Sequence, residues 1–195
     1  MSIVSSCPVE LAVMQCLASL PRPLNQPLKV AVAFSGGLDS MVLLHAVARC
    51  IKLHAQSMPD VNLLYAFHIH HGLSAHADQW QRFCQQQAEQ RDIFFASERI
   101  HLTPSPEGGI EQAARQGRYA ALQALCHRHD IGALLTAHHQ DDQAETVLLQ
   151  LLRGAGVHGL TAMPMTTSFV AQRAPLYRPF LSLSRQQLAD YAAQQ

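Results

Sequence analysis

The 195-residue chain contains very little lysine and carries no excess charge of either sign. Lys29 and Lys52 are its only lysines, the other twelve cationic side chains are arginines, and the formal net charge is zero. A neutral chain is poorly suited to grip nucleic acid unaided, because phosphate neutralisation supplies most of that affinity. The arginines still allow a local basic face, since a guanidinium group can bind phosphate through two hydrogen bonds.

Paired cysteines and long apolar runs are also missing. The five cysteines are widely scattered and form no C-x-x-C pair, which argues against a zinc site or an iron–sulfur cluster and indicates reduced thiols. Charges, histidines or prolines interrupt every apolar run before it reaches membrane-spanning length, and the N-terminus lacks the basic segment of a secretory signal. We therefore expect a cytoplasmic protein without a membrane partner.

Apolar runs typical of buried parallel strands alternate with helical patterns along the chain. Strands are expected at 29–34, 61–69, 93–100, 131–137 and 176–180, and helices at 8–20, 41–50, 74–91, 110–129, 140–153 and from 184 onward. This alternation predicts a single α/β domain over residues 1–195, with a parallel, Rossmann-like sheet between two layers of helices. Ligands of such sheets bind at the carboxyl ends of the strands. Three polar motifs fall there, after the first, second and fourth expected strands, at residues 35–40, 68–72 and 138–145.

Two of the expected helices carry apolar stripes that predict which side chains are buried. In the helix at 74–91, which Ser74 can cap, the stripe consists of Trp80, Phe83, Cys84 and Ala88. In the helix at 140–153 it consists of Ala144, Val147, Leu148 and Leu151. Residues 157–175 look irregular.

The first polar motif, Ser-Gly-Gly-Leu-Asp-Ser, stands between the first strand and the next helix. The unpaired N–H groups and the dipole of a helix start favour an anion, and glycines let the backbone approach it closely. The motif lacks the lysine of a Walker-type loop, which favours chemistry in which pyrophosphate leaves, and a carboxylate beside phosphate implies a bridging Mg²⁺. An ordinary strand–turn–helix junction is the alternative. The residues expected to hold phosphate are Ser35, Gly36, Gly37, Leu38, Asp39 and Ser40, with Asp39 as the Mg²⁺ ligand.

The second motif spans residues 137–146 and is rich in histidine and acid. His138, Asp142 and Glu145 are spaced i, i+4 and i+7, which would place them on one face of a helix start. Stabilisation of the helix dipole explains one or two carboxylates, and the spacing matches no zinc signature. We favour binding of a positively charged substrate by Asp142 and Glu145, with a metal site as the alternative.

Arginines and histidines supply the remaining candidates. Arg115 and Arg118 are one helical turn apart and could hold an α-phosphate while pyrophosphate departs; solvated surface arginines are the alternative. Which of the two is catalytic stays open. His68 and His70 share one face of the second strand, where one of them could line the pocket. The roles of four histidines are left open: His68, His70, His71 and His139.

Six stretches of the chain resemble, in the same order, the PP-loop enzymes (N-type ATP pyrophosphatases) and, within them, the bacterial tRNA(Ile)-lysidine synthetases. They are SGGLDS (35–40), HHGLSAHAD (70–78), ARQGRY (114–119), AHHQDDQAET (137–146), LLRGAGVHGLTAM (151–163) and LYRPFLSLSRQQL (176–188). The resemblance implies a fold of the adenine nucleotide alpha hydrolase type. It also implies an ATP-dependent ligase that adenylates the C2 oxygen of the wobble cytidine in tRNA(Ile) with a CAU anticodon. Pyrophosphate is released, and free L-lysine then displaces AMP to give lysidine.

The same resemblance assigns roles to the motif residues. ATP would lie on residues 35–40, with Asp39 acting through Mg²⁺, and Arg115 and Arg118 would contact phosphate or the activated base. Asp142 and Glu145 would bind or deprotonate lysine, and we count His138 among the catalytic residues.

Members of the resembled family continue beyond the stretch that corresponds to this chain, usually with C-terminal tRNA-binding domains. We therefore expect the chain to be a truncated N-terminal catalytic part, and a homodimer is left open. An inactive ATP-binding fragment is one alternative, and a PP-loop tRNA thiolase is another. Thiolases rely on cysteine chemistry, whereas Cys50, Cys84 and Cys126 are expected on helices away from the strand ends.

Overall fold

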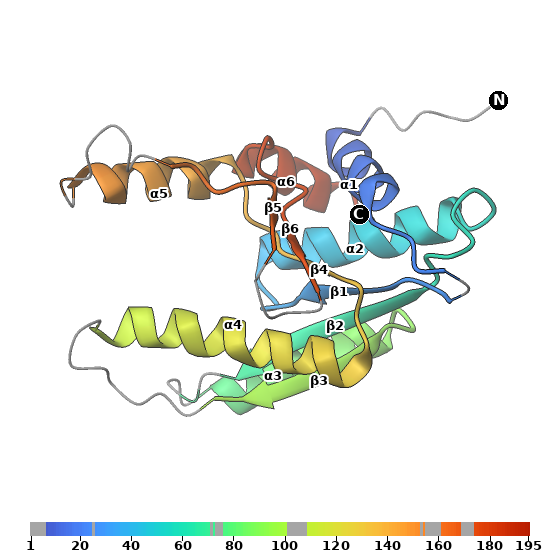
Figure 1. Ribbon diagram of the computed structural model, residues 1–195, viewed down its shortest axis with the longest axis horizontal. Helices are drawn as coiled ribbons and strands as arrows, with labels where there is room; N and C mark the ends of the chain where they lie inside the picture. Colours follow the sequence, from blue (N-terminus) through green and yellow to red (C-terminus); the bar gives the residue numbers. More distant parts are fainter. Residues whose placement is uncertain are drawn as a thin grey trace.

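The structure is a computed structural model that describes residues 7–24, 26–70, 72, 76–100, 109–152, 154, 161–168 and 174–195. Within these residues the strands form one six-stranded sheet in the order β3-β2-β1-β4-β6-β5 (Figure 1). Neighbouring strands are parallel, apart from the antiparallel β5–β6 pair. The strands are β1 (Lys29–Ala33), β2 (Leu63–His70), β3 (Phe94–Arg99), β4 (Ala133–Leu135), β5 (Thr166–Thr167) and β6 (Leu176–Tyr177).

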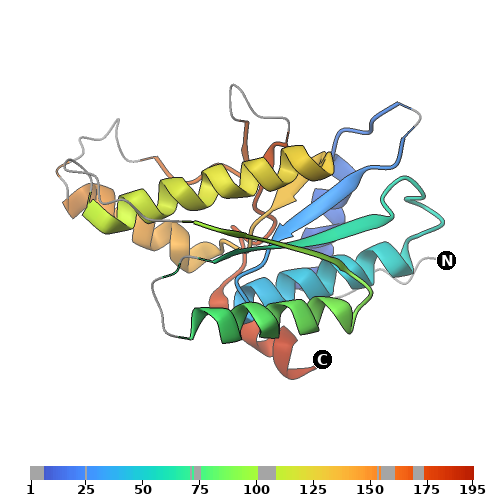
Figure 2. The ribbon, with the colours of Figure 1, turned by 90° about the horizontal axis from the view of Figure 1, so that it is seen from below.

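Helices lie on both faces of the sheet. The described helices are α1 (Pro8–Ser19), α2 (Leu38–Leu53), α3 (Ala77–Glu89), α4 (Gly109–His129), α5 (Gln140–Leu152) and α6 (Arg185–Ala193). One apolar core lies between the sheet and α1, α2, α3 and α6, and a second lies between the sheet and α4. Figure 2 shows α4 on one side of the strands and α2, α3 and α6 on the other. This three-layer arrangement confirms the predicted fold class.

The position of β1 explains where a ligand can bind. Val30, Ala31 and Val32 are completely buried, and β1 pairs with β2 on one side and with β4 on the other. The chain therefore leaves β1 and β4 toward opposite halves of the sheet. In open α/β sheets such a switch point creates a crevice at the carboxyl ends of the strands. The segments that follow β1 and β4 are residues 34–37 and 136–139, so the first two predicted motifs flank this crevice.

Several local predictions are confirmed, and others are wrong in detail. Ser184 caps α6 through a capping box with Gln187, as expected for the start of the last helix. The helix after the first motif begins at Leu38 instead of Met41, so the end of the motif forms the first helical turn. The short strand β5 lies in a region expected to be irregular. The proposed cap Ser74 lies outside the described residues.

The two predicted apolar stripes differ in outcome. On α3, Cys84 and Ala88 are completely buried, whereas the side chain of Trp80 is 47% exposed. On α5 no side chain is buried, and Leu148 and Leu151 are about half exposed, so the prediction of a core stripe there is wrong. None of the described helices combines the length and the apolar character that crossing a bilayer requires.

Candidate functional site

The loop between β1 and α2 presents a helix start that no side chain caps. The backbone N–H of Phe34 donates to Phe67 O at 2.7 Å, which extends the pairing of β1 with β2 up to the loop. Gly36 then takes a φ of +81°, a conformation open to glycine at little cost, and Gly37 is the N-cap residue of α2. Gly37 has no capping side chain, so the first turn keeps the unpaired N–H groups that attract anions.

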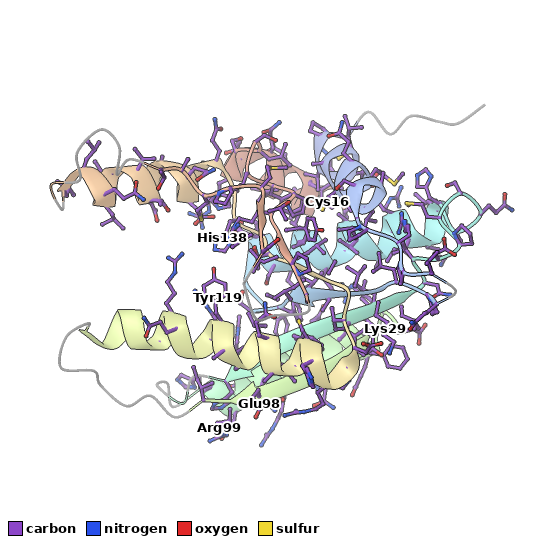
Figure 3. All side chains as sticks on the ribbon, viewed as in Figure 1. Cys16, Lys29, Glu98, Arg99, Tyr119 and His138 are labelled. Atoms are coloured by element: carbon purple, nitrogen blue, oxygen red, sulfur yellow. The ribbon has the colours of Figure 1, made fainter. Side chains whose placement is uncertain are left out.

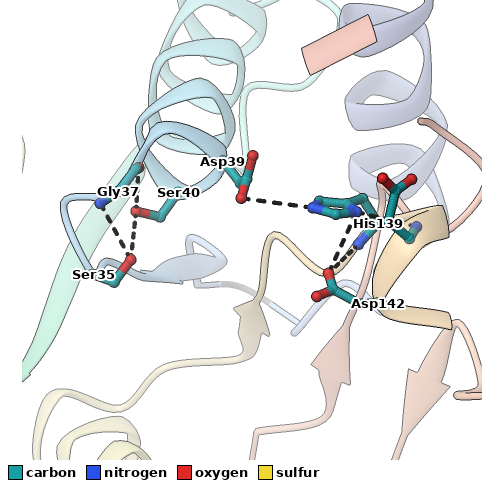
Figure 4. A network of polar contacts seen from close by, with 7 residues as sticks. Ser35, Gly37, Asp39, Ser40, His139 and Asp142 are labelled. Carbon is teal, nitrogen blue, oxygen red and sulfur yellow. Dashed lines mark hydrogen bonds and ion pairs between the residues drawn. The ribbon is translucent and has the colours of Figure 1, made fainter. Parts of the chain in front are cut away.

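Two serine hydroxyls hold this loop together (Figure 4). The hydroxyl of Ser40 donates to Gly37 O at 2.9 Å, which uses its only proton. The hydroxyl of Ser35 lies 3.0 Å from Ser40 Oγ and must therefore be the donor of that pair. The N–H of Gly37 donates in turn to Ser35 Oγ at 3.3 Å. The hydroxyls thus fix the turn from both ends.

Asp39 faces a short polar chain from the segment after β4 (Figure 4). His139 is buried, and its Nε2 lies 3.6 Å from Asp39 Oδ2. The N–H of Asp141 donates to His139 Nδ1 at 3.2 Å, so the ring proton resides on Nε2 and points toward Asp39. Asp142 Oδ2 accepts the backbone N–H of His139 at 2.8 Å. Asp39 Oδ1 is buried without a hydrogen-bond partner among the described residues, which suits a cation ligand.

A cavity of about 790 Å³ opens beside the loop, a volume typical of small-molecule sites. The elements around it are the loop, the end of β2, the start of α3, the middle of α4 and the segment after β4. Of the predicted site residues, those in its wall are Ser35, Gly37, Asp39, Ser40, Arg118, His138 and Asp142. Leu38, Arg115 and Glu145 are exposed and do not contribute to the wall.

His138 does not lie on the helix, which corrects the expected i, i+4, i+7 face. Helix α5 begins at Gln140, and the preceding imidazole is held by a 2.9 Å hydrogen bond between His138 Nδ1 and Thr136 Oγ1. Burial and the nearby positive charges of Arg178, Arg118 and Arg115 lower the pKa of His138 to about 4, although Asp142 opposes the shift. The imidazole is therefore neutral at physiological pH.

The predicted arginines share one aromatic partner on α4. The guanidinium carbons of Arg115 and Arg118 each lie 5.8 Å from the centre of the Tyr119 ring. Tyr119 projects from α4 toward the side of the molecule that carries His138 (Figure 3). Stacking on an aromatic face restrains an arginine without using up its N–H donors.

Arg178 is a buried cation that the sequence interpretation did not single out. Its Nη1 donates to Pro164 O and to Thr167 Oγ1, each at 2.8 Å, and only 6% of the residue is exposed. Burial lowers its pKa, whereas Tyr119 opposes the shift. A charged residue inside the apolar run 176–181 was the signal that could have identified it.

The histidines at the end of β2 contribute to the cavity wall. His68 Nδ1 donates to Phe34 O at 2.9 Å, and burial lowers the pKa of His68. The N–H of Gly72 donates to His70 Nδ1 at 3.1 Å, so His70 Nε2 carries the proton and donates to Asp78 Oδ1 at 2.9 Å. Both side chains line the cavity, whereas His71 lies outside the described residues.

Neither a resident metal cluster nor a reactive thiol is apparent in this site. Among the described residues, no group of three or more His, Cys, Asp or Glu side chains could hold a metal ion. A cation at Asp39 would therefore need further oxygens from a ligand such as phosphate. Cys84 lies directly under Gly36 and not away from the motif as expected, but burial raises the pKa of its thiol to about 11. Such a thiol is unreactive at neutral pH.

Comparison with known proteins places this chain in a family. The family described as "PP-loop domain" matches residues 9–195. A tRNA(Ile)-lysidine synthase from Ralstonia nicotianae is 52% identical over 163 residues, which are 84% of this chain and 34% of the relative. One from Pseudomonas putida is 49% identical over 168 residues, and the match covers 84% of this chain and 36% of the relative. The chain thus spans about a third of the length of the curated relatives it matches.

Solved structures show the same fold at low sequence identity. The U34-tRNA thiolase NcsA from Methanococcus maripaludis, solved with a [4Fe-4S] cluster, matches with a TM-score of 0.69 and 19% identity, over 97% of this chain and 64% of the thiolase. An FMN adenylyltransferase from Candida glabrata, in complex with FAD and inorganic pyrophosphate, matches with a TM-score of 0.55 and 11% identity. The match covers 95% of this chain and 53% of the adenylyltransferase. These likenesses concern the fold alone.

Proposed function

The chain belongs to the PP-loop domain family, and on this basis we propose that it is the ATP-binding part of an enzyme that joins lysine to tRNA(Ile). One observation carries the proposal: an uncapped helix start, a carboxylate with an unpartnered oxygen and an arginine meet around one cavity. This combination suits the triphosphate of ATP better than a neutral ligand. The names of relatives that are about half identical in sequence specify tRNA(Ile) lysidine formation.

ATP would be cleaved between its α- and β-phosphates. The first-turn N–H groups of α2, in a turn held together by the hydroxyls of Ser35 and Ser40, would hold pyrophosphate as it leaves, because no lysine is present in the loop. Asp39 would hold Mg²⁺, which when bound shields the negative charge of the phosphates. Arg118, which lines the cavity, would stabilise charge on the α-phosphate during attack by the C2 oxygen of cytidine, and Arg115 would assist from the other contact with Tyr119. That attack forms the C2–O–P bond and expels pyrophosphate.

The second step would use the acidic side of the cavity. Asp142 or Glu145 would take a proton from the attacking ammonium group of lysine, the resulting amine would attack C2 of the adenylated base, and the C2–O bond would break so that the oxygen leaves with AMP. Asp142 places a carboxyl group in the cavity wall, and Glu145 lies one turn further along α5, outside the wall. Lysine carries two ammonium groups, so two carboxylates at this spacing can attract both ends of the amine substrate. His138, neutral at physiological pH, would serve as a hydrogen-bonding group and not as a cation.

Recognition of tRNA needs more surface than this cavity. The chain is neutral overall, and its curated relatives are about three times as long. We propose that the CAU-bearing tRNA is bound largely by surfaces outside the residues described, and that the reaction takes place in the cytoplasm. A thiolase activity is disfavoured because the only described thiol directly beneath the loop, that of Cys84, is completely buried and poorly acidic.

The test is a reconstituted reaction with ATP, labelled L-lysine and tRNA(Ile) bearing CAU. We expect pyrophosphate release and tRNA-dependent incorporation of lysine, and Asp39→Asn should abolish both. Asp60→Asn, which changes an exposed carboxylate far from the cavity, is the matched control and should retain activity. Binding of ATP without incorporation would contradict the ligase reaction and identify the chain as an ATP-binding fragment.

A further inference from the structure

The only tryptophan of the chain lies against the loop that is proposed to bind phosphate. Trp80 stands in the first turn of α3, and its indole Nε1–H donates to the carbonyl oxygen of Ser35 at 2.5 Å. The side chain is 47% exposed and forms part of the cavity wall. One edge of the ring thus holds the loop, while the rest of the side chain faces open space or the cavity.

Helix α3 also covers the tightest point of the loop. A Cβ atom built on Gly36 would lie 2.7 Å from Cys84 Sγ and 3.1 Å from Trp80 Nε1. Both distances are too short for ordinary contacts, so Gly36 has no room to move toward α3. Trp80 in turn stacks on Phe83, with 5.2 Å between the ring centres. The loop therefore rests on a closely fitted surface.

The start of α3 is itself fixed to the ends of two strands. Asp78 Oδ1 accepts hydrogen bonds from His70 Nε2 at 2.9 Å and from Arg99 Nη2 at 2.5 Å. His70 is the last residue of β2, and Arg99 is the last residue of β3. This network lies two residues before Trp80, and it ties the position of the indole to the edge of the sheet.

We propose that Trp80 is a positioning residue, which holds the loop of residues 35–37 in its phosphate-binding conformation. This inference rests on the proposed function, since it assumes that the loop binds the phosphates of ATP. In a trans peptide the C=O and N–H bonds point in opposite directions. The hydrogen bond from Trp80 therefore fixes the Ser35–Gly36 peptide plane and with it the direction of the Gly36 N–H. A donor that is already oriented loses less freedom when the anion arrives.

The first test compares two substitutions on the same face of α3. Trp80→Phe keeps an aromatic ring but removes the N–H donor, and Phe83→Leu disturbs the ring stack but leaves the hydrogen bond intact. We expect Trp80→Phe to weaken the binding of ATP and of pyrophosphate about tenfold, as loss of one hydrogen bond can do. We expect Phe83→Leu to stay within about twofold of the wild type, although it also removes packing. Isothermal titration calorimetry measures both.

Kinetics separate a positioning role from a merely structural one. Loss of folded protein lowers kcat and leaves KM unchanged, because fewer molecules are active. Loss of loop order instead weakens ATP binding, so Trp80→Phe should raise the KM for ATP about tenfold while kcat stays within about threefold. A fall in kcat at unchanged KM would overturn the inference.

The uniqueness of Trp80 provides an independent readout. Pyrophosphate has no ring that could stack on the indole, so any change in tryptophan emission must come from the loop or from the charge it binds. We expect the emission to change along the same binding curve that calorimetry gives. If pyrophosphate binds without changing the emission, and Trp80→Phe binds pyrophosphate as tightly as the wild type does, the inference about Trp80 is overturned while the proposed function stands. Failure of the wild-type protein to bind either ATP or pyrophosphate would overturn the proposed function as well.

Discussion

The neutral, partly buried His138 should make the protein less stable in mild acid. Its imidazole is hydrogen-bonded to Thr136 and is surrounded by positive charge from two elements, with Arg178 after β6 and Arg115 and Arg118 on α4. These neighbours and burial outweigh Asp142, so the folded protein keeps the ring neutral down to a pKa of about 4. The test is His138→Gln, which keeps a polar side chain of similar size but cannot titrate.

The magnitude follows from the difference between the two states. An unfolded histidine has its ordinary pKa of about 6.5, so between about pH 6.5 and pH 4 the unfolded chain binds a proton that the folded protein lacks. Stability therefore falls as the pH drops through this window, and it levels off below the folded pKa. At about 1.36 kcal/mol per pKa unit, the loss between about pH 7.5 and pH 4.5 should be roughly 2.5 kcal/mol.

Urea unfolding of the wild type and of His138→Gln at both pH values measures this term. Other titrating groups contribute equally to the two proteins and cancel in the comparison, including His45, His68 and His129, whose pKa values are also lowered by burial. The pH-dependent loss should be about 2.5 kcal/mol smaller in His138→Gln. His127→Gln changes an exposed histidine on α4 and should retain the full loss. Equal losses in the wild type and in His138→Gln would refute the reasoning.

Three further substitutions test the loop and the two carboxylates of α5. Gly36→Ala should lower the free energy of unfolding by about 1–3 kcal/mol in urea titrations, because of the φ of +81° and the clash with Cys84; unchanged stability would contradict the observed loop geometry. Asp142→Asn should raise the KM for lysine in the incorporation assay and also cost about 1 kcal/mol of stability, since the carboxylate accepts the N–H of His139. Glu145→Gln should leave stability within about 0.5 kcal/mol, and an unchanged KM for lysine in both variants would exclude these carboxylates as the amine site.

Local signals were sufficient to predict the parts of the site that are built locally. The apolar run ending at Phe34 and the two glycines after it specify a buried strand and a tight turn, and both are present. Ser184 and Gln187 are three residues apart, the spacing of a capping box, and they form one. The polar motifs meet at one edge of the sheet because parallel strands align their carboxyl ends there.

Contacts between distant segments could not be predicted in the same way. Trp80 binds Ser35 across 45 positions of sequence, and Asp39 faces His139 across a hundred. No sequence pattern predicts either contact, because each contact depends on how far a helix is displaced along the sheet. Sequence periodicity places Trp80 correctly on the inner face of α3, but it cannot indicate that the ring lies at the border of a cavity, where half of it stays exposed.

Helix α5 also shows what sequence periodicity cannot predict. Its leucines recur with helical spacing, yet Leu148 and Leu151 are 56% and 50% exposed, because the helix does not lie on either face of the sheet. Its polar side chains make the tertiary contacts instead: Gln143 and Gln150 each exchange two hydrogen bonds with the backbone of the extended segment 161–163. An apolar stripe therefore indicates that a helix has a face able to pack, whereas the sheet and its crossovers decide whether anything within the chain packs against it.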